Sequence, residues 1–446
     1  MKKIKIKSAY IITVFLILIL GILIILNSSK LNSLYNKDKF ECGDKCNPQD
    51  LYDMNKMLDT STLQTEILSD TQNDNVRIIK TRYYGTNWIN EEIYLLADIY
   101  IPKNMPEENF GKAAISQKSS SAIEQGINFQ KDFGENTAVL LKIPVILFGP
   151  ENQVDETELA RKLRIKMMEN NDLTLEIVYP LTQSYMRTMT MAGTLEEAGN
   201  PEEFVTTGFS KRGYTQFQLS AVDNRVKGFM PNAYTAGNLI NYWNLVNEDL
   251  GGETNLGNAD ESLAWLNTEA GQKYQDLYDP YQFAELIDKP FILTTGTNDR
   301  LYPINSANGF FPEFSSQKAF SIVENYYHGM GSRKHLENWR AIIQRSFFGR
   351  KTPSVIVNDD INGNNLNVNA QISNSEFIKS VKLYYSNHND MDFSDSQWLS
   401  IEMQDDDNKY TASLEKTGNI LAYYVEVEDE KDSVKAYSSS LVQIIN

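Results

Sequence analysis

Two kinds of residue in this chain could carry nucleophilic chemistry: a serine in a glycine-flanked turn, and a histidine much later in the sequence. The turn is Gly208–Gly213, with the sequence GFSKRG, and it lies between an apolar run that ends at Thr207 and a helix-like segment that begins near Tyr214. A serine at a sharp strand-to-helix turn is a nucleophile elbow, in which glycines permit the strained backbone that exposes the hydroxyl. The second glycine comes one residue later than in the usual pattern, so an ordinary serine at the start of a helix is the alternative for Ser210.

Partners for Ser210 are easy to search for, because the chain has only three histidines. Hydrolases of the α/β type order their triad as serine, acid and histidine, with the acid just past a strand and the histidine in a late loop. Asp299 follows the strand-like run Pro290–Gly296, and His328 follows the strand-like run Ala319–Val323. This order predicts Ser210 as the nucleophile, Asp299 as the acid and His328 as the base.

Each of these assignments has an alternative. Asp299 could instead cap the turn after its strand, in which case Glu324 is the acid. His335, in the next helix, is the alternative base. His388 falls in a C-terminal region with a different pattern and is excluded as a base. Lys211 and Arg212 could bind an acidic substrate group, but surface exposure or helix packing is the simpler interpretation.

The elements that must position these residues predict an α/β-hydrolase domain over residues 61–350. Strand-like runs alternate with helix-like stretches, which indicates a mainly parallel sheet covered on both faces by helices. The early strand-like runs are Val76–Lys80, Ile93–Ile101, Ala113–Ser116, Ala138–Leu141 and Leu173–Tyr179, with a helix-like stretch at Ser121–Phe133. We expect the first two strands to form an antiparallel edge.

An aromatic-rich insert at about residues 234–285 lies between two strand-like runs, and it is expected to form a helical cap. In this kind of fold such an insert commonly roofs the site. The alternative is that its aromatic side chains form a core of their own.

The pattern changes after residue 350, and residues 353–446 predict a β-sandwich domain. Short strand-like runs with period-two alternation recur about every ten residues there. Two acidic segments are interpreted as solvated turns rather than calcium sites. In the loop that starts with Asn358–Gly363, Asn369 stands where a calcium loop needs a bidentate glutamate, and Asp405–Asn408 resembles a hairpin turn.

The N-terminal residues 1–27 predict a transmembrane helix, either an uncleaved signal anchor or a signal peptide that is removed. Lysines precede an apolar run from Ala9 to Leu26, whose length of about 27 Å as a helix is enough to cross a bilayer core. Residues 28–60 are polar and are expected to form a tether. The chain would thus be membrane-anchored with its catalytic body outside the cytoplasm, or secreted after cleavage. There, Cys42 and Cys46 are expected to form a small-loop disulfide.

Charge and composition exclude one class of partner. The 446 residues carry a formal net charge of -17, and such a field repels nucleic acid. We expect no nucleic-acid partner, no cofactor and no metal.

Several short blocks of sequence resemble the family of PhoPQ-activated pathogenicity-related proteins, from about residue 50 to the end. They are Ser210–Thr215, Ala221–Val226, Met230–Pro231, Asp279–Tyr281, Thr297–Asp299 and Asn325–His328. The resemblance implies an α/β fold of the α/β-hydrolase type, followed by a terminal β-sandwich. It also implies a triad of Ser210, Asp299 and His328. The elbow alone also resembles that of glucuronoyl esterases.

The oxyanion hole is the point at which the chain departs from that family. The fold normally supplies one backbone amide from the residue after the nucleophile, here Lys211, and one from the loop after the third strand, here near Gln117. The family tends to have glycines in that loop, whereas this chain has side chains from Gln117 to Ser121. Two functions therefore remain open: a serine hydrolase acting on an ester, thioester or amide, and an inactive hydrolase-fold protein that binds outside the cell.

Overall fold

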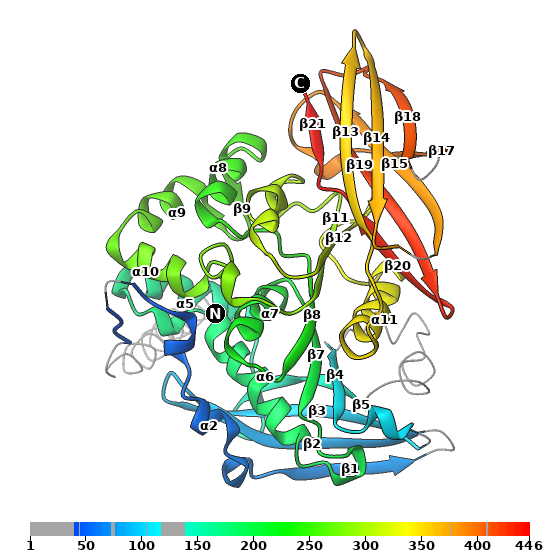
Figure 1. Ribbon diagram of the computed structural model, residues 1–446. Helices are drawn as coiled ribbons and strands as arrows, with labels where there is room; N and C mark the ends of the chain where they lie inside the picture. Colours follow the sequence, from blue (N-terminus) through cyan, green and yellow to red (C-terminus); the bar gives the residue numbers. More distant parts are fainter. Residues whose placement is uncertain are drawn as a thin grey trace, which may run out of the picture.

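A long twisted sheet forms the centre of the molecule, as seen in the computed structural model, which describes residues 40–43, 45–72, 76–103, 105–116, 139–375, 377–406 and 409–446 (Figure 1). Its N-terminal strands are β1 (Glu66–Gln72), β2 (Val76–Trp88), β3 (Glu91–Pro102), β4 (Lys112–Ser116), β5 (Val139–Phe148), β6 (Asn152–Gln153), β7 (Glu203–Phe209), β8 (Val226–Asn232), β11 (Phe291–Gly296) and β12 (Lys318–Val323). Their order is β1-β2-β3-β5-β4-β7-β8-β11-β12. The strands from β5 to β12 are parallel, and β1 to β3 form an antiparallel edge.

Helices cover both faces of the parallel part because its strands are apolar on both sides. The helices are α2 (Met54–Leu58), α5 (Glu156–Asn170), α6 (Val178–Ala192), α7 (Lys211–Val222), α8 (Leu239–Asp249), α9 (Ala259–Leu266), α10 (Glu269–Tyr278) and α11 (Arg333–Phe348). Phe204 and Phe229 face the main core together with Phe217 of α7, whereas their neighbours Val205 and Met230 face α11. This alternation between the two faces is the period-two geometry of a strand.

One predicted strand is wrong. Residues 173–175 form a single 3-10 turn, and α6 begins at Val178. Pro180, which in the sequence marked the end of a strand, lies in the first turn of α6, where a backbone N–H has no intrahelical partner and proline is tolerated. The predicted helix at Ser121–Phe133 lies outside the described residues.

The insert between β8 and β11 contains α8, α9, α10 and the short strands β9 (Glu253–Thr254) and β10 (Gly257–Asn258). Its aromatic side chains at Tyr242, Trp243 and Tyr278 are buried within the main core cluster. They therefore join the insert to the body of the molecule. The hydroxyl of Tyr242 donates a hydrogen bond to the carbonyl of Leu301 at 2.8 Å, which places α8 against the segment after β11.

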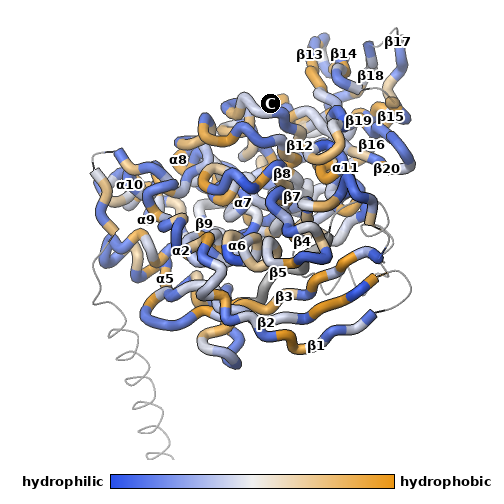
Figure 2. The backbone as a smooth tube through the Cα atoms, turned by 60° about the horizontal axis from the view of Figure 1, so that its bottom comes forward, coloured by the Kyte–Doolittle hydropathy of each residue, from blue (hydrophilic) through white to orange (hydrophobic). Residues whose placement is uncertain are grey.

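The C-terminal region is built of two sheets packed face to face (Figure 2). Its strands are β13 (Ser354–Asn362), β14 (Asn365–Ser373), β15 (Ile378–His388), β16 (Leu399–Glu402), β17 (Gln404–Asp406), β18 (Lys409–Glu415), β19 (Ile420–Lys431), β20 (Val434–Ser439) and β21 (Gln443–Ile445). One sheet has the order β13-β14-β18-β17. The other continues the central sheet, because β20 pairs antiparallel with β12 at Phe320 and Ser439. The two halves of the chain thus share one sheet.

The fold class predicted from the sequence is wrong in one part, the transmembrane helix. Among the described residues, no helix has both the length and the apolar character needed to cross a membrane. The longest of them, α11, has 16 residues, fewer than the roughly 20 that a span requires, and begins with Arg333 and Lys334. The stretch Ala9–Leu26, on which the prediction rested, lies outside the described residues.

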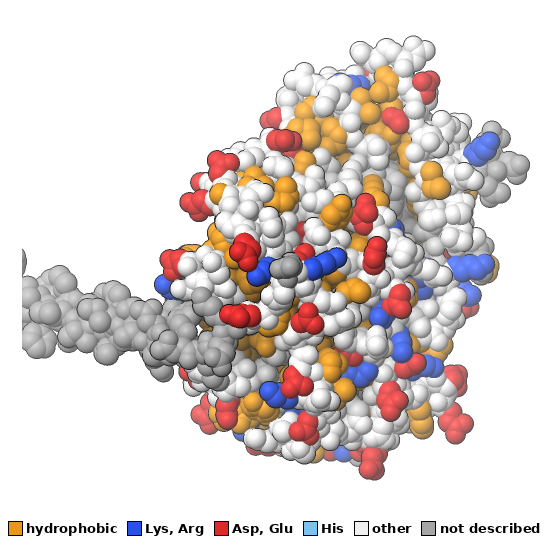
Figure 3. All heavy atoms as spheres, turned by 60° about the vertical axis from the view of Figure 1, so that its left-hand side comes forward, with side chains coloured by type: hydrophobic (Ala, Val, Ile, Leu, Met, Phe, Trp, Pro, Cys, Tyr) orange, Lys and Arg blue, Asp and Glu red, His pale blue; other side chains and the backbone are white. Residues whose placement is uncertain are grey.

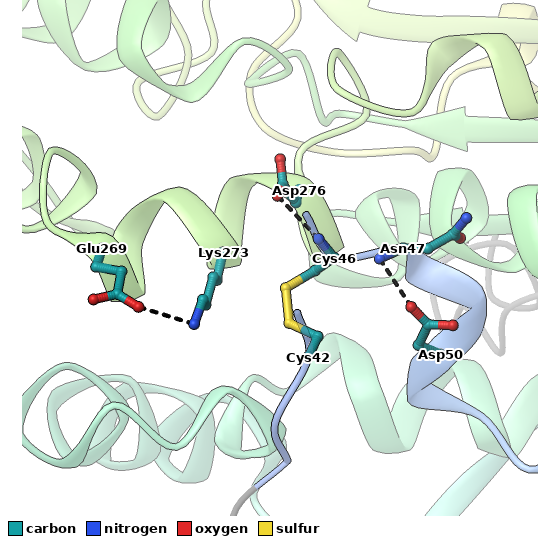
Figure 4. The surroundings of a disulfide bond; sticks show 7 residues. All are labelled: Cys42, Cys46, Asn47, Asp50, Glu269, Lys273 and Asp276. Carbon is teal, nitrogen blue, oxygen red and sulfur yellow. Dashed lines mark hydrogen bonds and ion pairs between the residues drawn. A yellow bond between two sulfur atoms is a disulfide. The ribbon is translucent and has the colours of Figure 1, made fainter. Parts of the chain in front are cut away.

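Cys42 and Cys46 form the expected small-loop disulfide (Figure 4). It lies beside α10, where the Cys46 N–H donates a hydrogen bond to the Asp276 carboxylate at 3.2 Å. A polar hollow of about 600 Å³ opens here, lined in part by Lys45 and Lys273. None of its lining residues belongs to the predicted triad, so the hollow is separate from the candidate site.

The surface is charged but mixed. Figure 3, which brings the left-hand side of Figure 1 forward, shows Asp and Glu side chains spread over the visible face, with Lys and Arg lying singly or in small groups between them. The face seen in Figure 3 therefore shows no continuous basic patch among the described residues.

Candidate active site

Ser210 occupies a strained turn between β7 and α7. Its backbone angles are φ 57° and ψ -122°, a region that a residue with a side chain rarely adopts. The strain is held by the neighbouring strand, because the Ser210 N–H donates to the carbonyl of Asn232 at the end of β8 at 2.9 Å. The turn therefore has the geometry of a nucleophile elbow rather than of an ordinary helix start.

The two glycines of the turn explain its unusual spacing. A Cβ on Gly208 would lie 2.3 Å from the carbonyl oxygen of Arg212, and a Cβ on Gly213 would lie 2.5 Å from that of Asn232. Real Cβ atoms do not come so close to backbone, so both positions need glycine. The second glycine comes late because it is Gly213, not Arg212, that packs against the end of β8.

Arg212 occupies the position where the usual pattern has its second glycine, and its side chain is directed into the protein. It forms an ion pair with Glu156 at the start of α5, and the two side chains are only 8% and 14% exposed. Burial opposes the charged form of Glu156, but Arg212 more than offsets this and lowers the pKa of that carboxyl. The Lys211 ammonium contacts Thr157 of the same helix at 3.1 Å. Both side chains thus tie the elbow to α5, as the helix-packing interpretation expected.

The structure brings the three predicted residues together. His328 Nε2 lies 3.0 Å from Ser210 Oγ, and His328 Nδ1 lies 2.7 Å from Asp299 Oδ2. The other oxygen of Asp299 accepts the N–H of Leu301 at 2.8 Å. The Asp299 side chain is only 1% exposed, whereas that of His328 is 21% exposed. A buried acid thus orients an imidazole that reaches the serine and remains partly open to solvent.

Aromatic rings enclose the imidazole. The ring of Phe209 lies 4.7 Å from that of His328, and the ring of Tyr302 lies 5.9 Å from it. Phe209 is the last residue of β7 and Tyr302 follows Asp299, so the two rings come from the segments that carry the serine and the acid. They limit the ways in which the imidazole can turn.

The alternative acid Glu324, the alternative base His335 and the excluded His388 lie elsewhere. Glu324 accepts a hydrogen bond from Lys334 at 2.6 Å. His335 lies in the first turn of α11 with its Nδ1 2.7 Å from Ser332 Oγ, and burial lowers its pKa to about 3. His388 lies at the end of β15 beside Asp390. Among the described residues, no hydrogen bond joins either of these histidines to Ser210.

The predicted oxyanion amides are described only in part. Lys211 is the first residue of α7, where backbone N–H groups have no partner within the helix and point toward the serine turn. Gln117 lies outside the described residues. Strand β4, which leads to it, lies between β5 and β7 and runs parallel to both. It therefore ends on the same side of the sheet as β7, the strand that precedes Ser210.

The residues that hold the loops of Asp299 and His328 are not among those predicted from the sequence. Asn298 and Asn325 contact the segment Phe393–Trp398 of the C-terminal region. Both asparagines stand in blocks that resemble the family, but their partners lie more than 70 residues away in the sequence. No local pattern could have paired them.

The first of the two acidic segments of the C-terminal region lies within a strand, and residues 407–408 of the second lie outside the described residues. Residues Asn358–Asn362 belong to β13 and pair with β14, so that segment is a strand and not the predicted turn. In the part of the chain that the structure describes, no group of three His, Cys, Asp or Glu side chains could hold a metal ion.

Several solved structures match parts of this chain at low identity. Acetyl xylan esterase 1 from Thermoanaerobacterium sp. JW/SL YS485 is 14% identical with a TM-score of 0.46, and the match covers 71% of this chain and 98% of that one. An acetyl xylan esterase from Paenibacillus sp. R4 is 13% identical with a TM-score of 0.47, covering 71% and 99%. A puromycin-hydrolyzing peptidase from Mycobacterium tuberculosis is 12% identical with a TM-score of 0.40, covering 60% and 39%. Similarity at this level transfers no activity or substrate.

Sequence comparison gives a firmer result. No curated protein matches the chain. The profile of the PhoPQ-activated pathogenicity-related proteins, however, matches residues 55–394, which is more than half of the chain and includes Ser210, Asp299 and His328. The chain therefore belongs to the PhoPQ-activated pathogenicity-related protein family.

Proposed function

We propose that this protein is a serine hydrolase that cleaves an ester or amide through an acyl-enzyme. One observation carries the proposal: Ser210, at a strained strand-to-helix turn, is followed by His328 and Asp299 in a continuous series of contacts at 3.0 and 2.7 Å. Family membership and the α/β fold are consistent with it.

The acylation step follows from the positions of these atoms. Ser210 Oγ attacks the substrate carbonyl carbon while its proton passes to His328 Nε2. Asp299, which accepts from Nδ1, holds the imidazole in the required tautomer and stabilises its positive form. The proton on Nε2 then passes to the leaving alcohol, thiol or amine, and the acyl group remains on Ser210.

Deacylation repeats the scheme with water. His328 takes a proton from water, the resulting hydroxide attacks the acyl carbon, and the proton returns to Ser210 as the acid product leaves. In both steps the carbonyl oxygen becomes negative. The amide of Lys211 and an amide of the loop near Gln117 are proposed to stabilise it.

The disulfide supports a location outside the cytoplasm. Cys42 and Cys46 are joined in the structure, and disulfides persist mainly in oxidising compartments. We therefore propose that the hydrolase acts on a substrate outside the cytoplasm.

A fluorophosphonate probe tests the function. The full-length protein is expected to be labelled, whereas Ser210→Ala is not. Ser220→Ala is a matched control, because Ser220 is a buried serine of α7 whose hydroxyl bonds to the carbonyl of Phe217. Absence of labelling in the wild type, or equal labelling of Ser210→Ala, would contradict a serine hydrolase and favour a binding protein.

Ester and amide substrates can then be separated on the labelled protein. We expect turnover of p-nitrophenyl acetate or of an aminoacyl p-nitroanilide, and the ratio of the two kcat/KM values identifies the preferred bond.

A further inference from the structure

A segment of the C-terminal region, Asp392–Trp398, lies against the loop that carries Asp299. The side-chain amide of Asn298, the residue before Asp299, donates to the carbonyls of Phe393 at 3.4 Å, Ser394 at 3.1 Å and Ser396 at 2.7 Å. Three acceptors around one amide fix the position of that side chain. The backbone of Asp299 is thereby fixed one residue away.

The same segment holds the loop that carries His328. The side-chain amide of Asn325 donates to the carbonyl of Trp398 at 2.9 Å, and its oxygen accepts the N–H of Trp398 at 2.8 Å. Asn325 has a φ of 51°, so its backbone turns sharply at the start of the histidine loop. This paired contact fixes the loop three residues before His328.

The acid and histidine loops are also joined to each other. The N–H of Asn298 donates to the carbonyl of Tyr326 at 2.9 Å, and the N–H of Asn325 donates to Thr297 Oγ1 at 2.8 Å. That hydroxyl in turn donates to the side-chain oxygen of Asn298 at 2.6 Å. Because this oxygen is already engaged, the NH2 group of Asn298 is the part that faces the C-terminal segment.

The C-terminal segment is itself held firmly. Asp392 accepts the N–H of Ser394 at 3.0 Å, and the hydroxyl of Ser396 donates to the carbonyl of Phe393 at 2.7 Å. The side chains of Phe393 and Trp398 are buried within the main hydrophobic core of the molecule. The segment can therefore act as a fixed support for the two loops.

We propose that the segment Asp392–Trp398 positions the acid and the base of the catalytic site through Asn298 and Asn325. The inference rests on the proposed function and adds to it a role for the C-terminal region in the reaction. The contacts of this segment are made before substrate binds. The loops that carry His328 and Asp299 therefore do not have to become ordered in the transition state. A displacement of about 1 Å in such a site can lower the rate about 100-fold.

Two substitutions remove the contacts separately. Asn298→Ala removes the donor to the three carbonyls. Asn325→Gly removes the pairing with Trp398 while keeping a backbone that glycine adopts readily at positive φ, so it remains informative if Asn298→Ala does not fold. Asn308→Ala is the matched control, since its amide donates to the carbonyl of Val442 at 2.8 Å and thus bridges the same two halves of the chain through a C-terminal segment other than Asp392–Trp398.

The measurements are the rate of labelling by a fluorophosphonate and the kcat and KM for p-nitrophenyl acetate. We expect Asn298→Ala and Asn325→Gly each to lower the labelling rate and kcat about 10- to 100-fold, with KM within about 2-fold and Tm close to that of the wild type. Asn308→Ala is expected to match the wild type within about 2-fold. In an Asp299→Asn background, adding Asn298→Ala should lower the labelling rate and kcat by less than about 2-fold further, because the carboxylate that Asn298 positions is already absent.

The outcomes separate the two proposals. A labelled wild type with unchanged rates in both variants overturns the positioning role and leaves the hydrolase intact. Equal losses in Asn308→Ala, or a full additional loss in the Asp299→Asn background, overturn it as well, because they indicate a general loosening of the fold. A wild type that is not labelled overturns the proposed function and the positioning role with it.

Discussion

Ser210 and His328 lie 3.0 Å apart, yet the contacts that hold them come from different parts of the chain. Ser210 is held by its neighbours in the hydrolase half: the glycines of its own turn, the end of β8, and the pair of Arg212 with Glu156. The loops of His328 and Asp299 are held by the C-terminal half. Ser210 thus depends mainly on contacts within the hydrolase half, whereas the loops of His328 and Asp299 also depend on the packed C-terminal half.

The two ends of the loop that carries His328 are also connected to the C-terminal half. Lys334, at the start of α11, contacts Glu324 at 2.6 Å and Glu426 of β19 at 2.7 Å. Glu324 and Lys334 stand on either side of His328 in the sequence, so their ion pair closes the loop. Glu426 connects this closure to the C-terminal sheet, which lies beside α11 in Figure 1.

The largest expected effect tests whether the two regions act as one unit. Ser210→Ala and His328→Ala are each expected to lower kcat by about 10⁴-fold or more, and the double variant should lose no more than the larger single loss, because either change removes the same proton transfer. Single-turnover kinetics with p-nitrophenyl acetate measure this. Multiplied losses in the double variant would contradict the comparison, since they would mean that the two residues act independently.

The next largest effect is expected for the buried ion pair beneath the elbow. Arg212→Met leaves the carboxylate of Glu156 buried without its partner and is expected to lower the free energy of unfolding by about 3–5 kcal/mol, measured by urea denaturation. The double variant Arg212→Met with Glu156→Leu should recover most of this loss, because no charge remains buried.

An exposed pair in the second region is the control. Arg300 and Asp395 form an ion pair between side chains that are 71% and 78% exposed. Arg300→Met is expected to cost less than about 1 kcal/mol. A loss as large as that of Arg212→Met would mean that the support of the acid loop depends on this charge pair.

Glu426 gives the second region a pH dependence of stability near neutral pH. Burial raises the pKa of Glu426 to about 7, although Lys334 opposes the shift. Because the folded protein favours the protonated form, the stability from this group is complete below about pH 4.5 and is lost as the pH rises through about 7. The loss from pH 4.5 to 8 is expected to reach up to about 3 kcal/mol, since one unit of pKa corresponds to about 1.4 kcal/mol.

The variant Glu426→Gln isolates this contribution. It cannot titrate, so the difference in free energy of unfolding between wild type and variant should fall as the pH rises from 5 to 8. Urea denaturation at several pH values measures it. A difference that is constant, or that rises with pH, would show that Lys334 keeps Glu426 charged throughout this range.

The last effect concerns Gly208, the first glycine of the turn at Ser210. Gly208→Ala is expected to cost about 1–3 kcal/mol, because its Cβ would lie 2.3 Å from a backbone oxygen that cannot move without disturbing α7. Gly193→Ala is the control, since its nearest contacts lie at an ordinary 3.4 Å. Equal thermal stability of the two variants would mean that the turn can relax, and that it does not require a glycine at position 208.

Sequence reasoning reached the residues whose signals are local. The order of serine, aspartate and histidine, each just past an apolar run, led to three side chains that the structure brings within hydrogen-bonding distance. It failed where a local signal has two meanings. Pro180 fits the end of a strand or the first turn of a helix, and packing against β2 and β5 decided for the helix.

By itself, the sequence determined the glycine-permitted turn at Ser210 and the alternating apolar pattern of the strands, because backbone freedom and side-chain period are properties of neighbouring residues. Only the tertiary structure decided that Arg212 pairs with Glu156, that β20 joins β12, and that Asn298 and Asn325 contact Asp392–Trp398. Such contacts join residues many positions apart in the chain. They depend on how whole sheets pack, and no spacing within a single segment encodes that.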